Sequence, residues 1–146
     1  MLKVYRLNFD DDMFNDVRKV RNDVFVVEQG VNSCDEYDGY EISSKHYLIK
    51  KNNISCGVAR WRKTQKGIKL ERFAVLYNYR GFGVGKRLVR EVLKDVLPFK
   101  KLIYLHSQKK SIKFYEKLSF KKEGDIFKEA GIDLCLMIFK AYLSNH

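Results

Sequence analysis

Proline and cysteine are both scarce in this sequence. Pro98 is the only proline among 146 residues, and the three cysteines, Cys34, Cys56 and Cys135, stand singly and far apart. An odd number of cysteines without C-x-x-C spacing argues against a disulfide framework, so we expect reduced thiols. The three histidines are equally dispersed, and the sequence therefore predicts no metal site.

Long apolar runs are also lacking. No stretch approaches the roughly 18 residues that a membrane-spanning helix needs, and the first residues, MLKVYRLNFDDD, lack the apolar core of a signal peptide. With 45% hydrophobic residues, the chain can bury a core of its own. We therefore expect one globular domain over residues 1–146, in the cytoplasm and without a membrane partner.

Positive charge, by contrast, is abundant. Lysine and arginine number 29 against 18 aspartates and glutamates, which gives a formal net charge of +11. Such a charge attracts nucleic acid or any other anionic ligand, and it also serves solubility. Because the chain carries no recognised basic helix or aromatic RNA-binding motif, nucleic-acid binding is not the favoured interpretation.

Hydrophobic periodicity predicts an α+β fold. Alternating apolar residues favour strands, and apolar residues at spacings of three and four favour helices. Asn52 and Asn53 indicate a hairpin turn, Pro98 closes the longest helix, and the loss of periodicity over 31–44 predicts a loop or a broken helix. The expected order is strand 2–7, a helix ending near Gly30, strands 46–50, 54–63 and 68–76, helix 84–97, strand 101–107, helix 111–120 and a last strand within 131–143.

A glycine-spaced turn, RGFGVG, joins one of these strands to the longest helix. This arrangement points the unpaired N–H groups at the start of a helix toward whatever lies over the turn, which favours phosphate binding. Gly81, Gly83 and Gly85 allow the ligand to approach the backbone closely, while Arg80 and Lys86 add positive charge. The turn is therefore our candidate binding site for a pyrophosphate group.

Two common phosphate loops do not fit this turn. A Walker A loop requires a glycine and a Ser or Thr at the positions of Arg80 and Arg87. A Rossmann loop has the spacing G-x-G-x-x-G, whereas the spacing here is G-x-G-x-G and follows a strand meander. Neither a nucleoside triphosphate nor a dinucleotide is predicted.

The turn resembles motif A of the GNAT superfamily of acyl-CoA-dependent N-acyltransferases. The motif pattern, [QR]-x-x-G-x-[GA], is met by Arg80, Gly83 and Gly85, and the family's FYEK helix is matched by SIKFYEKLSF. The strings VFVVEQG, LHSQ, FYEKLSF and GIDLCLMIF, in this order, look most like the ElaA-type branch of small bacterial members. The resemblance covers nearly the whole chain.

Three residues depart from the family pattern. Gln108 stands where the family often has Asn, Ser111 where it often has Ala, and Ser119 where it usually has Gly. Glutamine keeps an amide that can bind pantetheine and serine remains small, so we expect binding to survive. Ser119 affects only the local backbone angle.

The resemblance implies a mixed, mostly antiparallel central sheet flanked by helices, with two strands that splay into a V for acyl-CoA. It implies an N-acetyltransferase that uses acetyl-CoA as co-substrate, without a metal, and acetylates a primary amine of a small molecule or peptide directly. The cofactor-binding residues that it implies are Phe73, Ala74, Val75, Arg80, Gly81, Phe82, Gly83, Val84, Gly85, Lys86, Gln108, Ser111 and Phe114.

The reaction also needs a proton acceptor, because an alkylamine with a pKa near 10 is mostly charged at neutral pH. Glu71, just before the acyl site, is our catalytic candidate for this base, and a surface ion pair is its alternative role. Glu28, the acids within 35–41 and a water chain are the other candidates. The resemblance implies that a backbone N–H near Ala74 or Val75 polarises the acetyl carbonyl.

Tyr115 stands where the family places a tyrosine near the CoA sulfur, and we predict that its phenol is a catalytic acid. Its alternative role is a core aromatic beside Phe114; one of the two must point outward, and the resemblance favours Tyr115. His106 is either a base or, as is commoner, a hydrogen-bonded structural residue. A covalent intermediate on Cys56 or Cys135 is not expected, because both lie in apolar strand segments.

The acidic segment CDEYDGYE, residues 34–41, either recognises a cationic amine or forms a solvated loop. An alternative function for the same cleft is a non-catalytic acyl-CoA sensor. Neither the amine acceptor nor the oligomeric state, whether monomer or homodimer, follows from the sequence.

Overall fold

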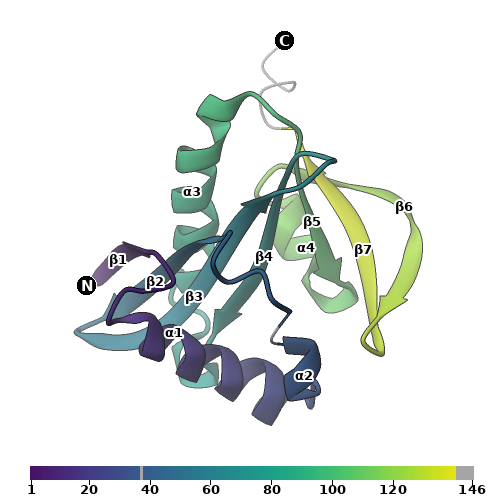
Figure 1. Cartoon of the computed structure of the whole chain (residues 1–146). Coiled ribbons are helices and arrows are strands. Elements are labelled where there is room, and N and C mark those ends of the chain that lie inside the picture. Colours follow the sequence, from purple (N-terminus) through teal and green to yellow (C-terminus); the bar gives the residue numbers. More distant parts are fainter. Residues whose placement is uncertain (37, 141–146) are drawn as a thin grey trace.

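The computed structural model describes residues 1–36 and 38–140, which form one seven-stranded sheet flanked by helices (Figure 1). The strand order is β1-β2-β3-β4-β5-β7-β6, and β4–β5 is the one parallel pair among the strands described. This confirms the mixed, mostly antiparallel sheet. The strands are β1 Leu2–Leu7, β2 Lys45–Lys51, β3 Ile54–Lys63, β4 Ile68–Val75, β5 Ile103–Gln108, β6 Phe120–Glu129 and β7 Ile132–Phe139.

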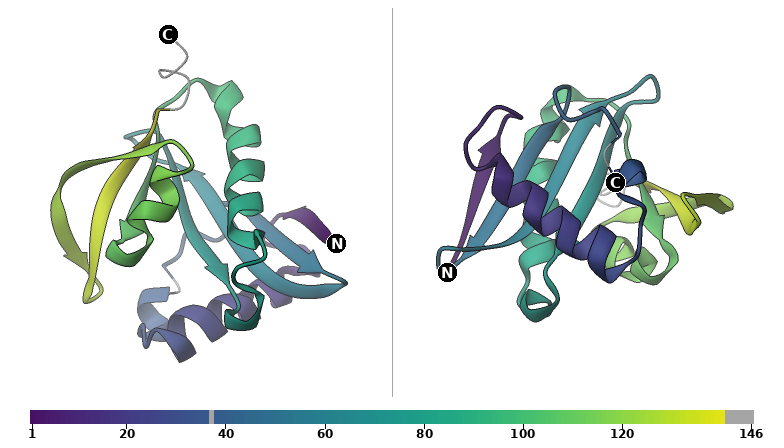
Figure 2. Two further views of the ribbon diagram at one scale, coloured as in Figure 1. Left: turned by 180° about the vertical axis from the view of Figure 1, so that it is seen from behind. Right: turned by 60° about the horizontal axis from the view of Figure 1, so that its bottom comes forward.

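Helices cover both faces of the sheet, as the two views of Figure 2 make plain. Helix α3, Val84–Val96, packs its apolar stripe on one face together with the short helix α4, Ile112–Glu116. Helix α1, Phe14–Arg21, packs on the other face and continues as a π-helix, η1, Asn22–Glu28. The remaining short helices are α2 Ser33–Glu36 and the 3₁₀ turns η2 Tyr77–Tyr79, η3 Leu97–Phe99 and η4 Lys109–Ser111.

Most of the predicted elements are confirmed, but strand β6 was missed. Its sequence, FKKEGDIFKE, is largely charged, and only Phe120 is buried, so no apolar alternation marks it. Antiparallel pairing with β7 along most of its length holds it in the sheet. The last strand ends at Phe139, and residues 141–146, to which the predicted strand and domain extend, lie outside the described part.

The parallel ladder between β4 and β5 is short. It contains three residue pairs and ends at Leu70 opposite Leu105. Beyond it, β4 carries a bulge against β3, where Arg72 and Phe73 together oppose a single residue, and Arg72 has a φ of 58°. The bulge bends β4 away from β5, which confirms the predicted V-shaped splay.

Among the described residues, no helix is both long and apolar enough to span a membrane.

Ser119, the departure from the family's glycine, has a left-handed backbone conformation with a φ of 75°. A side chain costs roughly 1–2 kcal/mol there because its Cβ crowds the carbonyl oxygen. We predict that Ser119→Gly raises the free energy of unfolding by up to about 1 kcal/mol, since the flexibility of glycine in the unfolded chain offsets part of the gain.

Urea unfolding of the purified protein measures this change. Ser119→Ala is the matched control, because it keeps the Cβ and removes the hydroxyl. An increase in stability with alanine equal to that with glycine would contradict the backbone explanation.

Candidate active site

The turn before α3 has the backbone of a phosphate cradle. Gly81 and Gly83 have φ angles of 87° and 80°, and Gly83 is the N-cap of α3. A Cβ added at either glycine would meet no atom within 4 Å, so the space above the turn is open. The N-terminal N–H groups of this 13-residue helix therefore point into open space that an anion can reach.

The side chains around the cradle differ in their surroundings. Val84 is buried in the core and offers only its backbone, whereas Lys86 and Phe82 are exposed. The ammonium of Lys51, on the β2–β3 hairpin, lies 3.5 Å from the centre of the Phe82 ring. Lys51 and Lys86 therefore bring positive charge to the turn.

Arg80 does not project freely into the cradle. Its guanidinium donates two hydrogen bonds of 2.7 Å to the carboxylate of Glu28 and one of 2.9 Å to the carbonyl of Val75. The hydrogen bonds from Arg80 lower the pKa of Glu28 against a smaller opposing effect of burial. Arg80 therefore ties the turn to β4 and η1, and part of the positive charge predicted for it is already neutralised.

Helix α4 closes the other side of the cradle. A Cβ added at Gly85 would lie 3.3 Å from Cζ of Phe114 and 3.8 Å from a methyl carbon of Val75. The first turn of α3, the end of β4 and the aromatic ring of α4 thus meet at one place. The structure brings the predicted residues of three separate segments together here.

Two backbone amides of β4 face the gap between β4 and β5. The amide of Leu76 donates to the carbonyl of Cys56 on β3, at 2.9 Å. Because successive amides of a strand point to opposite sides, those of Phe73 and Val75 point away from β3 and into the gap. The amide of Ala74 points to β3. Of the two amides predicted to polarise the acetyl carbonyl, Ala74 and Val75, only that of Val75 is therefore suitably directed, and the amide of Phe73 is a further candidate.

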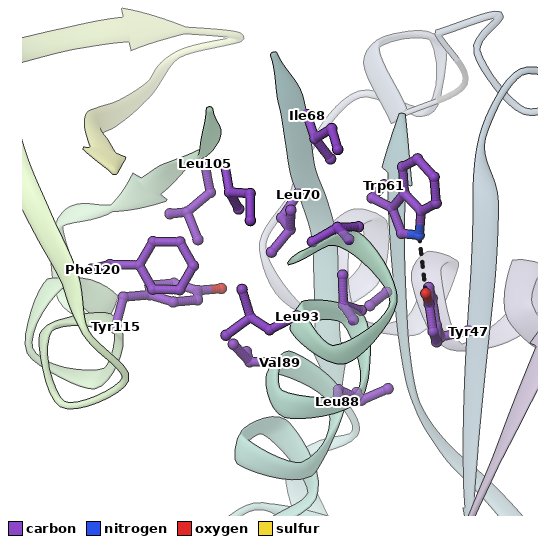
Figure 3. Packing of buried hydrophobic residues seen from close by; sticks show 14 of the residues in the cluster. Tyr47, Trp61, Ile68, Leu70, Leu88, Val89, Leu93, Leu105, Tyr115 and Phe120 are labelled. Atoms are coloured by element: carbon purple, nitrogen blue, oxygen red, sulfur yellow. Dashed lines mark hydrogen bonds between the residues drawn. The ribbon is translucent and has the colours of Figure 1, made fainter. Parts of the chain in front are cut away.

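Tyr115 lies at the inner end of this gap. Its ring makes edge contacts with Phe73, Phe114 and Phe120 at centroid distances of 6.2, 5.0 and 5.8 Å. Its side chain lines a cavity between β4 and β5, and in Figure 3 its hydroxyl points away from α4, toward Leu93 on α3. Burial raises the pKa of the phenol, so Tyr115 holds its proton at any physiological pH.

The outward-pointing member of the Phe114–Tyr115 pair was predicted wrongly. Phe114 is 38% exposed and Tyr115 only 8%. The reason is that Tyr115 packs in the core cluster between α3, β5 and β6, while Phe114 covers the cradle. A buried phenol that reaches a cavity still fits the predicted acid.

The cavity itself has a volume of about 480 Å³ and lies where β4 and β5 part. Its walls come from η1 and the segment after it, from β4 and β5, and from the β6–β7 turn. Gln108 and Ser111 line it at the far end of β5, where Gln108 donates a 3.0 Å hydrogen bond to Gln29. The space is lined from both faces of the sheet, by Leu105 and Tyr115 on the α3 side and by Phe25 and His106 on the α1 side.

The acids of the 34–41 segment whose side chains the structure describes, Glu36, Asp38 and Glu41, are held in ion pairs. Glu36 and Glu41 form ion pairs with the buried Arg21, and Asp38 and Glu41 with the buried Arg60. Both arginines are no more than 2% exposed. The solvated loop is therefore wrong for these three acids, which belong to a largely buried ion-pair network. Recognition of a cationic amine stays a prediction, and Glu36 and Asp38 line the cavity. The side chains of residues 34, 35 and 37 lie outside the described part.

Glu71 belongs to the same network. Its carboxylate accepts hydrogen bonds from Arg60 and Arg62 and forms an ion pair of 3.4 Å with Lys69. Burial alone would raise the pKa of Glu71, but the charges of these three residues outweigh it and lower the pKa. The ion pair predicted as the alternative role is present, although buried, and the role of Glu71 as a base stays a prediction.

Sequence reasoning missed the arginines of this network. Arg21 lies on the apolar stripe of α1, between Val17 and Val24, and a charged residue in the buried phase of such a pattern indicates a buried ion pair. Arg60 and Arg72 have no comparable signal in the sequence. The amide of Gln29 was missed as well.

Within the described part, no group of three or more His, Cys, Asp or Glu side chains is arranged to hold a metal ion.

Comparisons with known proteins agree with this geometry. Residues 15–141 match the family model described as an acetyltransferase (GNAT) domain. The YyaT protein of Bacillus subtilis is 32% identical over 141 residues, which cover 93% of this chain and 94% of that protein.

Solved structures share the fold. ElaA of Escherichia coli superposes with a TM-score of 0.83 at 24% identity, over 94% of this chain and 99% of that chain. A GNAT family acetyltransferase from Elizabethkingia anophelis, determined with acetyl-CoA bound, has a TM-score of 0.67 at 17% identity, over 94% of each chain.

The network predicts an acid-dependent loss of stability. Burial would raise the pKa of Asp38, but hydrogen bonds from Arg60 and the Tyr40 amide, with the charges of Arg60 and Arg72, lower it from 3.8 to about 2. Because the folded-state pKa is depressed, this stabilisation is complete above pH 4 and is lost as the pH falls toward 2.

The Asp38→Asn variant tests this prediction. We expect it to be less stable than the wild type by about 2 kcal/mol at pH 7 and the difference to shrink below pH 4. Urea unfolding across this range measures it, with the exposed Asp10→Asn as control. A difference that stays constant down to pH 2 would contradict the assignment.

Proposed function

The chain belongs to the GNAT acetyltransferase family, and we propose on that basis that it transfers the acetyl group of acetyl-CoA directly to a primary amine. The observation that carries the proposal is the junction of the glycine turn at the start of α3 with the splayed strands β4 and β5. The acetyl-CoA complex of the Elizabethkingia anophelis relative supports the choice of donor. The acceptor is a small molecule or a peptide.

Residues of the turn bind the pyrophosphate of the donor. The backbone N–H groups from Gly81 to Gly85 and the first turn of α3 supply the hydrogen bonds, and Lys86 supplies charge. Arg80, held by Glu28 and Val75, keeps the turn in position. Phe82 and Phe114 border the site on its two sides.

The free edges of β4 and β5 bind the pantetheine arm between them. Backbone groups along both strand edges face this gap, and an extended chain with its own amides pairs, as an added strand would, with those that do not bind the acetyl oxygen. At the far end Gln108 offers a side-chain amide, and Ser111 leaves space beside it. These residues place the thioester near the inner end of the gap.

The chemistry needs stabilisation of negative charge and a proton for the leaving thiolate. The amides of Phe73 and Val75 are placed to donate to the oxygen of the tetrahedral intermediate, a contact worth a few kcal/mol. The nitrogen forms its bond to the acetyl carbon, the carbon–sulfur bond breaks, and the Tyr115 phenol donates its proton to sulfur. Burial keeps that proton in place until the thiolate forms.

The first prediction concerns donor binding. Gly83→Ala places a methyl group over the cradle, and we expect the affinity for acetyl-CoA to fall about tenfold or more, which is at least about 1.4 kcal/mol. Gly124→Ala is the matched control, because Gly124 has the same φ of 80° and equally open space but lies in β6. Calorimetric titration of both variants measures the difference; equal losses would contradict the cradle.

The second prediction concerns turnover. The wild type should release free thiol from acetyl-CoA in the presence of at least one of spermidine, lysine and glucosamine. Tyr115→Phe should lower kcat about 100-fold with little change in KM for acetyl-CoA, because only the proton donor is removed.

Tyr5→Phe, at the opposite end of the sheet, is the control for this variant and should keep wild-type kinetics. Full turnover by Tyr115→Phe would rule out the phenol as the acid. Tight binding of acetyl-CoA without thiol release, across a wider amine library, would favour the non-catalytic sensor.

A further inference from the structure

His106 occupies the point where the two strands separate. It follows Leu105, which forms the last pair of the parallel ladder with Leu70. Leu105 is buried in the core on the α3 side, and because side chains alternate along a strand, His106 projects to the opposite face. There it lines the 480 Å³ cavity. The imidazole and the Tyr115 phenol therefore reach the start of the gap from different elements, β5 and α4.

Neither nitrogen of His106 is held by a hydrogen bond to any residue that the structure describes, and Nδ1 is fully buried. The ring is instead fixed by apolar contacts, with centroids 5.0 Å from Phe127 and 5.9 Å from Tyr104. His46 is a useful contrast, since its Nε2 lies 2.8 Å from the carbonyl of Glu41. The common structural role of a buried histidine, which is hydrogen bonding to the backbone, thus applies to His46 and not to His106.

Charged groups reach His106 from three elements. β4 contributes Lys69 and Glu71, the β3–β4 turn contributes Lys66 and β6 contributes Glu129. The facing strand β7 places the apolar Leu136 opposite it. Burial first, and then the lysines, lower the pKa of the imidazole against the weaker effect of the two glutamates. The ring is therefore neutral at pH 7 and has a lone pair to offer.

We propose that His106 is the base that accepts the proton of the acceptor amine, directly or through one water molecule. The inference rests on the proposed function, and it replaces Glu71 in that role. The Glu71 carboxylate is occupied by two arginines and a lysine, whereas the imidazole, which lines the same cavity, has no hydrogen-bond partner among the described residues. Glu71 then serves to hold the cations beside β4.

The protons balance with this assignment. The ammonium group of the acceptor gives one proton to His106, which passes it to solvent, and the neutral nitrogen attacks the acetyl carbon. The nitrogen loses a second proton as the amide forms, and Tyr115, after giving its own proton to the thiolate, regains one from solvent. The sum is one amide, one free thiol and one proton released.

Removal of the imidazole tests the proposal. With acetyl-CoA and the most active amine among spermidine, lysine and glucosamine, we expect His106→Ala to lower kcat by about 100-fold or more and to leave KM for acetyl-CoA within about twofold. Added imidazole should restore part of the rate in proportion to its neutral form. A structural role would not produce this rescue.

The pH profile gives a second readout. Because protonation removes the lone pair, kcat of the wild type should decline in acid, with a midpoint below the ordinary imidazole pKa of about 6.5, and this decline should be absent from His106→Ala. His46→Ala is the matched control: imidazole should not restore any activity that it loses. Thermal unfolding of all variants separates loss of fold from loss of the base.

The outcomes separate this inference from the proposed function. Absence of thiol release by the wild type with every amine overturns both. An active wild type together with a His106→Ala variant that keeps kcat within threefold, or loses it without rescue by imidazole, overturns the role of His106 alone. Loss of the acidic decline in Glu71→Gln, with His106 present, would return the role to Glu71.

Discussion

The end of pairing between β4 and β5 is the constraint on which the site depends. A parallel ladder that continued past Leu70 and Leu105 would satisfy both strands and leave no space between them. The bulge at Arg72 prevents this by turning β4 aside. Buried amides need partners, so an opened strand edge is stable only where water or a ligand can reach it. The same opening leaves strand edges with which an extended, amide-bearing ligand could pair.

The buried ions maintain that bend. The Arg72 guanidinium donates to the carbonyl of Glu36 and to the carboxylate of Asp38, so the bulged residue is anchored to the segment after α2. The carboxylate of Glu36 pairs with Arg21, and that of Asp38 pairs with Arg60. Charges buried this deeply add little net stability, but loss of one leaves its partners uncompensated, which favours a single arrangement of the segment. The network is better understood as a means of positioning than as a source of stability.

Local sequence patterns predicted the fold where one residue type determines the backbone. The glycines of the turn, the asparagine pair of the hairpin and the apolar stripe of α3 each specify an element without tertiary information. Strand β6 could not be recognised in this way, because pairing with β7 rather than its own composition places it in the sheet. The bulge at Arg72 also has no local signal, since no glycine occupies the position of positive φ.

The site, too, was predicted only where one continuous stretch of sequence forms it. The cradle is continuous in sequence, and the turn alone identifies it. Partner choice among charged residues depends on distances across the fold, so the pairing of Arg80 with Glu28 and the enclosure of Glu71 by cations could not be read from spacing. His106 was weighed as a structural residue, and only its lack of hydrogen-bond partners in the folded chain distinguishes it from His46.

The π-helix η1 determines which residues lie at the mouth of the gap. Glu28 and Gln29, adjacent in sequence at its end, contact the two arms separately, Glu28 through Arg80 beside β4 and Gln29 through Gln108 on β5. Each residue of an α-helix advances about 100° around the axis, so the wider turn of a π-helix changes the direction in which everything after it points. A regular α-helix of the same length would point Glu28 and Gln29 in other directions. These two adjacent residues would then no longer link the β4 side and the β5 side of the gap.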